Sequence, residues 1–100
     1  MRIVAEKNLR EYCRSHADVA DQLLAWLEDA KAANWESPND VTAKYPFTSI
    51  LGNSRICFNI KGNSYRLIVA VSYRAKIVLL KFIGTHTEYN KIDAETVEMF

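Results

Sequence analysis

The stretch RICFNIKGNSYRLIVAVSY, residues 55–73, decides the fold of this chain of 100 residues. Apolar and polar residues alternate on both sides of Gly62-Asn63, as they do in half-buried β-strands, and Gly-Asn is typical of a tight two-residue turn. The stretch therefore predicts an antiparallel hairpin. A second short turn at Arg74-Ala75 leads into a third strand over Ile77–Ile83.

Two-residue turns also fix the register of these three strands. The expected pairs are Lys61 with Ser64, Asn59 with Arg66, Tyr73 with Lys76, Arg66 with Ile83, and Ile68 with Lys81. Directly paired residues share a face of the sheet. One face is then apolar and suited to receive helices, and it collects Ile56, Phe58, Ile60, Tyr65, Leu67, Val69, Val71, Val78, Leu80 and Phe82. The other face is cationic but partly apolar, and it collects Arg55, Cys57, Asn59, Lys61, Arg66, Ile68, Ala70, Leu79, Lys81 and Ile83.

The N-terminal part of the chain has the periodicity of helices. Arg2–Val4 fit a short edge strand, and Asn8 followed by Glu11 resembles a helix N-cap. Ser15 and Asp18 repeat this pattern. Apolar residues then recur at helical spacing, namely Val19, Leu23, Trp26, Leu27, Ala30 and Ala33.

The segment Trp35–Asn53 contains Pro38, Pro46 and Gly52 and is expected to be a connection with one helical turn from Ser37. The whole pattern predicts an α+β fold, with two N-terminal helices packed on one face of a small antiparallel sheet in the order β-α-α-β-β-β. We expect one domain over residues 1–100.

Composition excludes several classes of protein. With 49% hydrophobic and 25% charged residues, the chain is an ordinary folded domain and not a disordered tail. No apolar run approaches the roughly 20 residues of a membrane helix, and residues 1–10 lack the apolar stretch of a signal peptide, so we expect a cytoplasmic protein without a membrane partner. Cys13 and Cys57 are expected to be free thiols, and no pair of Cys or His has the spacing of zinc ligands, so no metal is expected.

Charge is unevenly distributed along the chain, although the net charge is only +1. Residues 1–40 carry five basic and eight acidic side chains, and residues 88–100 carry one basic and four acidic side chains. The basic segment between them, residues 41–87, has no Asp or Glu, and its seven cations are Lys44, Arg55, Lys61, Arg66, Arg74, Lys76 and Lys81. This asymmetry favours a surface that faces a polyanion, although basic residues on solvated strands would give the same count.

Lys81 interrupts a strand otherwise made of Ile, Val, Leu and Phe. An ion pair would explain it, but the basic segment offers no carboxylate. Because an unpaired, partly buried charge is costly, we expect Lys81 and Arg66 to bind a phosphate group.

A histidine, a tyrosine and a lysine follow the last strand within six residues, as His86, Tyr89 and Lys91. The ordinary pKa of histidine suits proton transfer near neutral pH, although a lone His at a strand end is often only structural. Beside a cationic face, this group suits phosphodiester chemistry, with cations for the phosphate and His86 and Tyr89 for protons.

These residues resemble the HigB-type toxins of the RelE superfamily, which belong to bacterial type II toxin-antitoxin systems. The resemblance spans most of the chain. Its strongest parts are Tyr45-Pro46, Ser49, Arg55–Asn63, Tyr65–Leu67, Lys81–His86, Glu88-Tyr89 and Lys91–Asp93. It implies a compact microbial RNase fold with the order of elements given above.

The resemblance also implies an activity and partners. Such toxins are mRNA interferases that cut mRNA in the ribosomal A site without a cofactor, by attack of the ribose 2′-hydroxyl on the adjacent phosphorus, and so inhibit translation. A helix-turn-helix antitoxin of the HigA type would block the activity, and operator DNA would be reached only through that antitoxin. Because the net charge is low, docking to the ribosome would depend on the basic segment.

Site residues follow from the resemblance by position. Arg66 matches a phosphate-contacting arginine, His86 matches a catalytic His or Arg, and Tyr89 lies near an aromatic that stacks on a base or donates a proton. Lys61 and Lys81 suit charge in the transition state. Contacts to the RNA backbone suit Arg55, Asn59, Arg74 and Lys91. Asn90 departs from the family pattern, which has Asp there in many relatives.

Three functions therefore compete. The first is a ribosome-dependent endoribonuclease that uses His86 and Tyr89 beside Arg66 and Lys81. The second is a non-catalytic inhibitor of translation that binds the ribosome or RNA through the same basic face, and it would survive loss of His86. The third is a structural partner of the antitoxin in operator repression, harmless when expressed alone.

Overall fold

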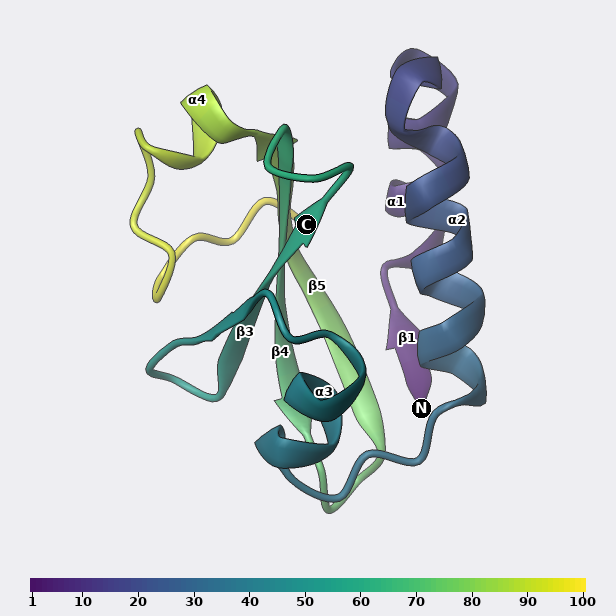
Figure 1. The fold of residues 1–100 in the computed structure, drawn as a ribbon, viewed down its shortest axis with the longest axis vertical. Helices are drawn as coiled ribbons and strands as arrows, with labels where there is room; N and C mark the ends of the chain where they lie inside the picture. Colours follow the sequence, from purple (N-terminus) through teal and green to yellow (C-terminus); the bar gives the residue numbers. More distant parts are fainter.

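Two N-terminal helices lie against one face of a five-stranded sheet in the computed structural model, which describes residues 1–100 (Figure 1). The elements in chain order are β1 (Arg2–Val4), α1 (Glu6–Ser15), α2 (Ala17–Ala32), α3 (Pro38–Lys44), β2 (Thr48–Ile50), β3 (Arg55–Ile60), β4 (Tyr65–Ser72), β5 (Ile77–Thr85) and α4 (His86–Tyr89). The expected α+β class and the packing of the helices on the sheet are confirmed. None of the helices combines the length and the apolar character needed to cross a membrane.

The sheet has the strand order β1-β5-β4-β3-β2. It is mixed and not purely antiparallel, because β1 pairs in parallel with β5 at the edge. The expected order of elements also lacked β2 and α4, whereas the helical turn expected from Ser37 is confirmed as the seven-residue helix α3. Pro38 begins α3 at a first-turn position where its missing N–H costs nothing, and β2 has only three residues, too few to show an alternating pattern.

The hairpin of β3 and β4 has the expected register. Asn59 pairs with Arg66 and Ile60 with Tyr65. At the turn, Lys61 and Gly62 both have positive φ, of 54° and 62°. Glycine adopts this conformation without a steric penalty. The first turn therefore places Asn59 and Arg66 side by side, as the sequence predicts.

The hairpin of β4 and β5 departs from the expected register at Lys81. Pairing follows the prediction from Ser72 with Ile77 as far as Val69 with Leu80, and then shifts by one residue. Ile68 pairs with Phe82 and Arg66 with Gly84, so the expected pairs of Ile68 with Lys81 and Arg66 with Ile83 are wrong. Lys81 is the extra residue of a β-bulge, which periodicity alone does not reveal.

The bulge exchanges the faces of the two residues that follow it. Ile83 points into the main core, whereas Phe82 belongs to a smaller cluster on the outer face with Cys57 and Ile68. The prediction had assigned these two residues to the opposite faces. Phe82 thereby becomes available to pack beside the segment that follows β5.

The main core is centred on Phe58 of β3, which is 1% exposed. Three aromatic rings surround it, with centroid distances of 5.3 Å to Trp26, 6.4 Å to Trp35 and 5.2 Å to Tyr45. Trp26 comes from α2, and Trp35 and Tyr45 flank α3. The ring contacts therefore connect the helices and the α3 connection to the middle of β3.

The outer face of the sheet is partly covered by the C-terminal segment, residues 90–100. Ile92, Ala94 and Val97 pack against the smaller cluster. Arg55 is only 2% exposed and donates to the carbonyl oxygens of Ala94, at 3.2 Å, and Val97, at 2.6 Å. This face is therefore not the open cationic surface that the sequence predicts.

Glu98 supplies the carboxylate that the basic segment lacks. Its two oxygens accept from Arg55, at 3.1 Å, and from Lys81, at 2.7 Å. The inference that Lys81 has no carboxylate partner is therefore wrong, because the partner lies outside the local stretch of sequence. The pKa of Glu98 is lowered chiefly by the hydrogen bond from Lys81.

We predict that Arg55→Met detaches the C-terminal segment while the main core stays folded. The substitution removes three hydrogen bonds of a buried cation and should cost about 2–4 kcal/mol of unfolding free energy. Lys81→Met is the matched control, and it should cost less than about 1 kcal/mol because its partner Glu98 is exposed. Chemical denaturation and hydrogen exchange of residues 92–98 check both values, and equal losses in the two variants would contradict the anchoring role of Arg55.

Candidate active site

Most cations of the basic segment are neutralised by carboxylates from the flanking segments. The pairs are Lys44 with Asp29 at 3.7 Å, Lys61 with Asp18 at 3.6 Å, and both Arg55 and Lys81 with Glu98. Arg66, Arg74 and Lys76 have no carboxylate within ion-pair distance. Lys76 donates to the carbonyl oxygen of Trp35 at 3.1 Å.

Arg74 and Arg66 lie at opposite ends of the β4–β5 hairpin. Arg74 is eight positions beyond Arg66 along the chain, which corresponds to about 26 Å of extended strand. Arg74 is exposed in the turn, whereas Arg66 is only 8% exposed. Arg66 is therefore the buried cation without a carboxylate partner, and the candidate site is built around it.

The Arg66 guanidinium is held from both sides. Nη1 donates to the carbonyl oxygens of Asn63, at 2.9 Å, and Tyr65, at 3.4 Å. Nη2 lies 3.1 Å from Nδ1 of His86, and the guanidinium carbon lies 5.5 Å from the ring centroid of Tyr89. The structure therefore brings three of the predicted catalytic residues together, whereas the fourth, Lys81, lies in the bulge and pairs with Glu98.

Gly84 makes room for this arrangement directly opposite Arg66. A Cβ at this position would lie 2.5 Å from the Phe82 ring and 3.2 Å from the Glu88 carboxylate. The Phe82 ring would have to move, since real Cβ contacts are not that short, and the Glu88 carboxylate would have to shift slightly. Any side chain larger than hydrogen would therefore displace the groups that support Tyr89 and α4.

His86 is positioned by a capping box at the start of α4. The Thr85 hydroxyl accepts from the backbone N–H of Glu88 at 3.1 Å, and the Glu88 carboxylate accepts from the backbone N–H of Thr85 at 2.8 Å. The hydrogen bond from the Thr85 backbone is the main reason why the pKa of Glu88 is lowered. These reciprocal bonds fix the first turn of α4, and His86 is its first residue.

The contact with Arg66 determines which nitrogen of His86 carries the proton. Arginine has donors only, so Nδ1 must accept the hydrogen bond and Nε2 carries the hydrogen of the neutral ring. Nδ2 of the Asn90 amide lies 3.5 Å from Nε2, and because both of these atoms carry hydrogens in this tautomer, the contact is not a hydrogen bond. Both ring nitrogens therefore have a neighbour, and the lone pair of His86 points at the cation.

Tyr89 lies between Arg66 and Phe82, whose ring centroid is 6.5 Å from that of Tyr89. Burial, followed by the neighbouring Cys57 thiol, raises the pKa of the Tyr89 hydroxyl. A tyrosine of raised pKa stays protonated at neutral pH, so it can donate a proton but not accept one. Burial also raises the pKa of Cys57, which packs under Tyr89 as a small apolar group.

The remaining predicted RNA-binding residues are spread around the molecule. Asn59 is exposed beside Arg66, Lys61 lies in the adjacent turn, and Lys91 follows α4 closely. Arg55 lies under the C-terminal segment and Arg74 at the opposite end of β4. No three His, Cys, Asp or Glu side chains gather as a metal site would require.

Sequence reasoning missed the groups that support these residues. The spacing Thr85-x-x-Glu88 is the signature of a capping box and could have been found in the sequence. The contact of Asn90 with His86 and the packing of Cys57 beneath Tyr89 had no such signal, because they depend on the bulge and on how the chain leaves β5.

Comparison with known families identifies the family of the chain. A family model described as the RelE-like toxic component of a toxin-antitoxin system matches residues 19–92, from α2 to just beyond α4. The match covers most of the chain, and the chain belongs to this family, the HigB toxins. A toxin of such a system has a cognate antitoxin. No curated protein matches the chain at a significant level.

We predict that the placement of His86 weakens at acid pH. The pKa of Glu88 is lowered in the folded chain, so its hydrogen bond from Thr85 contributes its full stability above about pH 4.5. This stability is lost as the pH falls through the lowered pKa, because the carboxylate is then protonated. Thr85→Val should remove the other half of the box at all pH values, at a cost of about 1 kcal/mol. Hydrogen exchange of the Glu88 amide measures both effects, and an exchange rate unaffected by the substitution would contradict the capping role.

Proposed function

We propose that this protein is a ribosome-dependent endoribonuclease that cuts mRNA in the A site and thereby inhibits translation. The proposal rests on one observation, the 3.1 Å contact between the buried Arg66 guanidinium and Nδ1 of His86 in a member of the HigB toxin family. The reaction would take place in the cytoplasm, where ribosomes are available. A helix-turn-helix antitoxin of the HigA type would block it and carry the operator contacts.

Arg66 is proposed to bind the scissile phosphate. Guanidinium groups bind phosphate oxygens through two parallel hydrogen bonds, and the Arg66 group is already held in place by Asn63 and Tyr65. When Nη2 turns to a phosphate oxygen, it releases the lone pair on Nδ1 of His86. Binding of RNA would thus produce the free base that the reaction needs.

The reaction proceeds by transfer within the RNA backbone. Nδ1 of His86 takes the proton of the ribose 2′-hydroxyl, and the 2′ oxygen forms a bond to phosphorus. The bond from phosphorus to the 5′ oxygen breaks, and that oxygen takes a proton from the Tyr89 hydroxyl. The products are a 2′,3′-cyclic phosphate and a 5′-hydroxyl, and the Arg66 charge stabilises the transition state.

The residues around Arg66, His86 and Tyr89 have other roles in this proposal. Lys61 and Lys91 contact the RNA backbone near Arg66, and the uncharged Asn59 contacts the nucleotide beside it. Lys81 can add charge to the transition state only after Glu98 releases it, since the two are paired at 2.7 Å.

Primer extension on a defined mRNA, with and without ribosomes, tests the activity. Ribosome-dependent cuts should be made by the wild-type chain and lowered about 10²–10⁴-fold in His86→Ala and Arg66→Ala. Arg14→Ala, an exposed cation on α1, is the matched control and should cut normally. Arrest of translation without any cut would favour the non-catalytic inhibitor, and unchanged cutting by His86→Ala would remove that residue from the mechanism.

The two roles of Tyr89 can be separated by substitution. Tyr89→Phe keeps the ring beside Arg66 but loses the proton donor, so cleavage should fall about 10²-fold with substrate binding unchanged. Tyr89→Leu also loses the contact with the cation and should weaken binding. Single-turnover rates over a range of ribosome concentrations distinguish these effects, and full activity of Tyr89→Phe would show that the hydroxyl donates no proton.

A further inference from the structure

Phe47 is the most exposed large apolar side chain of the molecule, at 79%. It lies between Pro46 and the start of β2, beside the core residue Phe58 and the partly buried Tyr45 that packs against that core. Exposing a whole aromatic ring to water is unfavourable, and nothing in the packing of the sheet requires it. An exposed ring at this position is therefore of interest as a binding group.

Strand register places Phe47 in line with the candidate active site. Thr48 pairs with Phe58, so the preceding residue, Phe47, comes next to Asn59. Asn59 in turn pairs with Arg66. Neighbouring strands are about 4.8 Å apart, so Phe47 and Arg66 lie about 10 Å from each other across the sheet.

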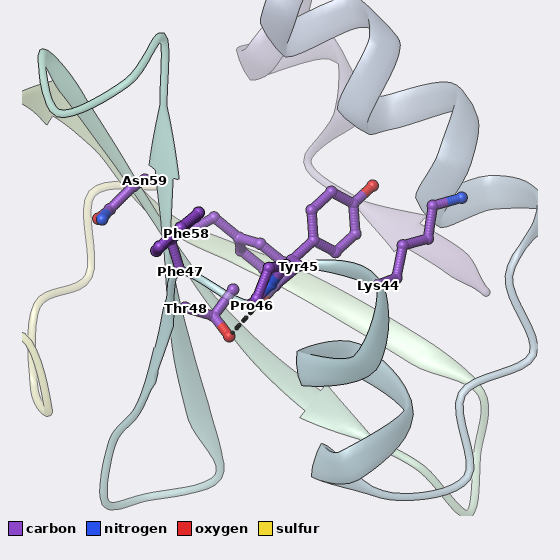
Figure 2. A pocket seen from close by; sticks show the side chains of 7 residues that line it. All are labelled: Lys44, Tyr45, Pro46, Phe47, Thr48, Phe58 and Asn59. Carbon is purple, nitrogen blue, oxygen red and sulfur yellow. Dashed lines mark hydrogen bonds between the residues drawn. The ribbon is translucent and has the colours of Figure 1, made fainter.

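The surface around Asn59 is hollowed. A pocket of about 120 Å³ is lined by Phe47, Phe58 and Asn59 together with Lys44, Tyr45, Pro46 and Thr48 (Figure 2). A second, wider hollow of about 450 Å³ is lined by Phe47, Asn59, Gly62 and Asn63. The wider hollow extends toward Arg66, because the Asn63 carbonyl oxygen accepts from the Arg66 guanidinium.

Asn59 provides a polar group between the ring and the cation. It is the only exposed residue of β3, and Figure 2 shows its side chain on the side of the strand away from Tyr45. Its amide has both donors and an acceptor, which match the edge of a nucleobase. No carboxylate lines either hollow, so nothing there repels an RNA strand.

We propose that Phe47, Asn59 and the Gly62-Asn63 turn form a binding site for one unpaired nucleobase of the RNA, adjacent to the phosphate held by Arg66. Proteins bind single-stranded RNA by stacking bases on aromatic rings and reading base edges with polar side chains. This inference rests on the proposed function for its ligand. It adds a residue, Phe47, that positions the codon and takes no part in bond breaking.

The test uses a single-stranded RNA in which 2-aminopurine, a fluorescent base, stands next to a 2′-deoxy position that cannot be cut. The RNA is titrated with the protein both free and as mRNA on ribosomes, and the label is moved along the RNA in a series. The wild-type chain should change the fluorescence at one label position, and Phe47→Ala should weaken binding about tenfold or more and abolish the change. Phe47→Trp should restore both.

Ile50→Ala is the matched control, because Ile50 is also exposed, at 53%, and lies in the neighbouring strand β2. It should leave RNA binding and fluorescence unchanged. The thermal midpoint of each variant establishes that it is folded, as expected for substitutions at exposed positions.

The outcomes separate this inference from the proposed function. If the wild-type chain cuts mRNA and Phe47→Ala leaves binding and fluorescence unchanged, the base site is wrong and the nuclease stands. If no cut occurs but the fluorescence change depends on Phe47, the base site stands and the nuclease is wrong. Failure of the wild-type chain to change the fluorescence in either setting overturns the base site. The base site is also wrong if Phe47→Ala binds RNA normally and loses only its binding to the purified antitoxin.

Discussion

The extra residue in β5 at Lys81 determines how the two faces of the sheet are used. Without the bulge, Phe82 would point into the main core and Ile83 would lie opposite Arg66. With it, Phe82 lies under Tyr89, and Gly84, which has no side chain, faces Arg66. One inserted residue thus gives the outer face a small apolar cluster against which Tyr89 packs, and it places a residue without a side chain opposite Arg66.

The sequence was sufficient for the fold class, the first hairpin and the grouping of Arg66 with the residues after β5. Each of these depends on local signals, namely the period of two, the Gly62-Asn63 turn and the position of His86 and Tyr89 just after the last strand. The bulge could not be predicted in the same way, because Val78–Ile83 is apolar on both sides of Lys81 and alternation carries no information in such a run. The edge strand over Arg2–Val4 was predicted, but the opposite edge strand β2 was missed, since a strand of three residues acquires its structure from its partner.

Charge illustrates the limit of reading a sequence segment by segment. The basic segment has no carboxylate of its own. Four of its seven cations nevertheless form ion pairs with carboxylates from outside it, namely Asp18 and Asp29 of α2 and Glu98 near the C-terminus. The local excess of positive charge is therefore much smaller on the folded surface than along the chain. What distinguishes Arg66 is that its partners are two carbonyl oxygens, an imidazole nitrogen and an aromatic face, and none of them is a carboxylate.

The capping box of α4 has a further consequence for how the protein can be inhibited. His86 and Tyr89 lie within one turn of helix, and Arg66 is directly across the strand pair from Gly84, two residues before that turn. The groups proposed for the chemistry therefore occupy one short end of the sheet, not a cleft between separate lobes. A ligand that contacts only this end of the sheet is enough to cover all of these groups, or to displace the single turn of α4, without surrounding the toxin.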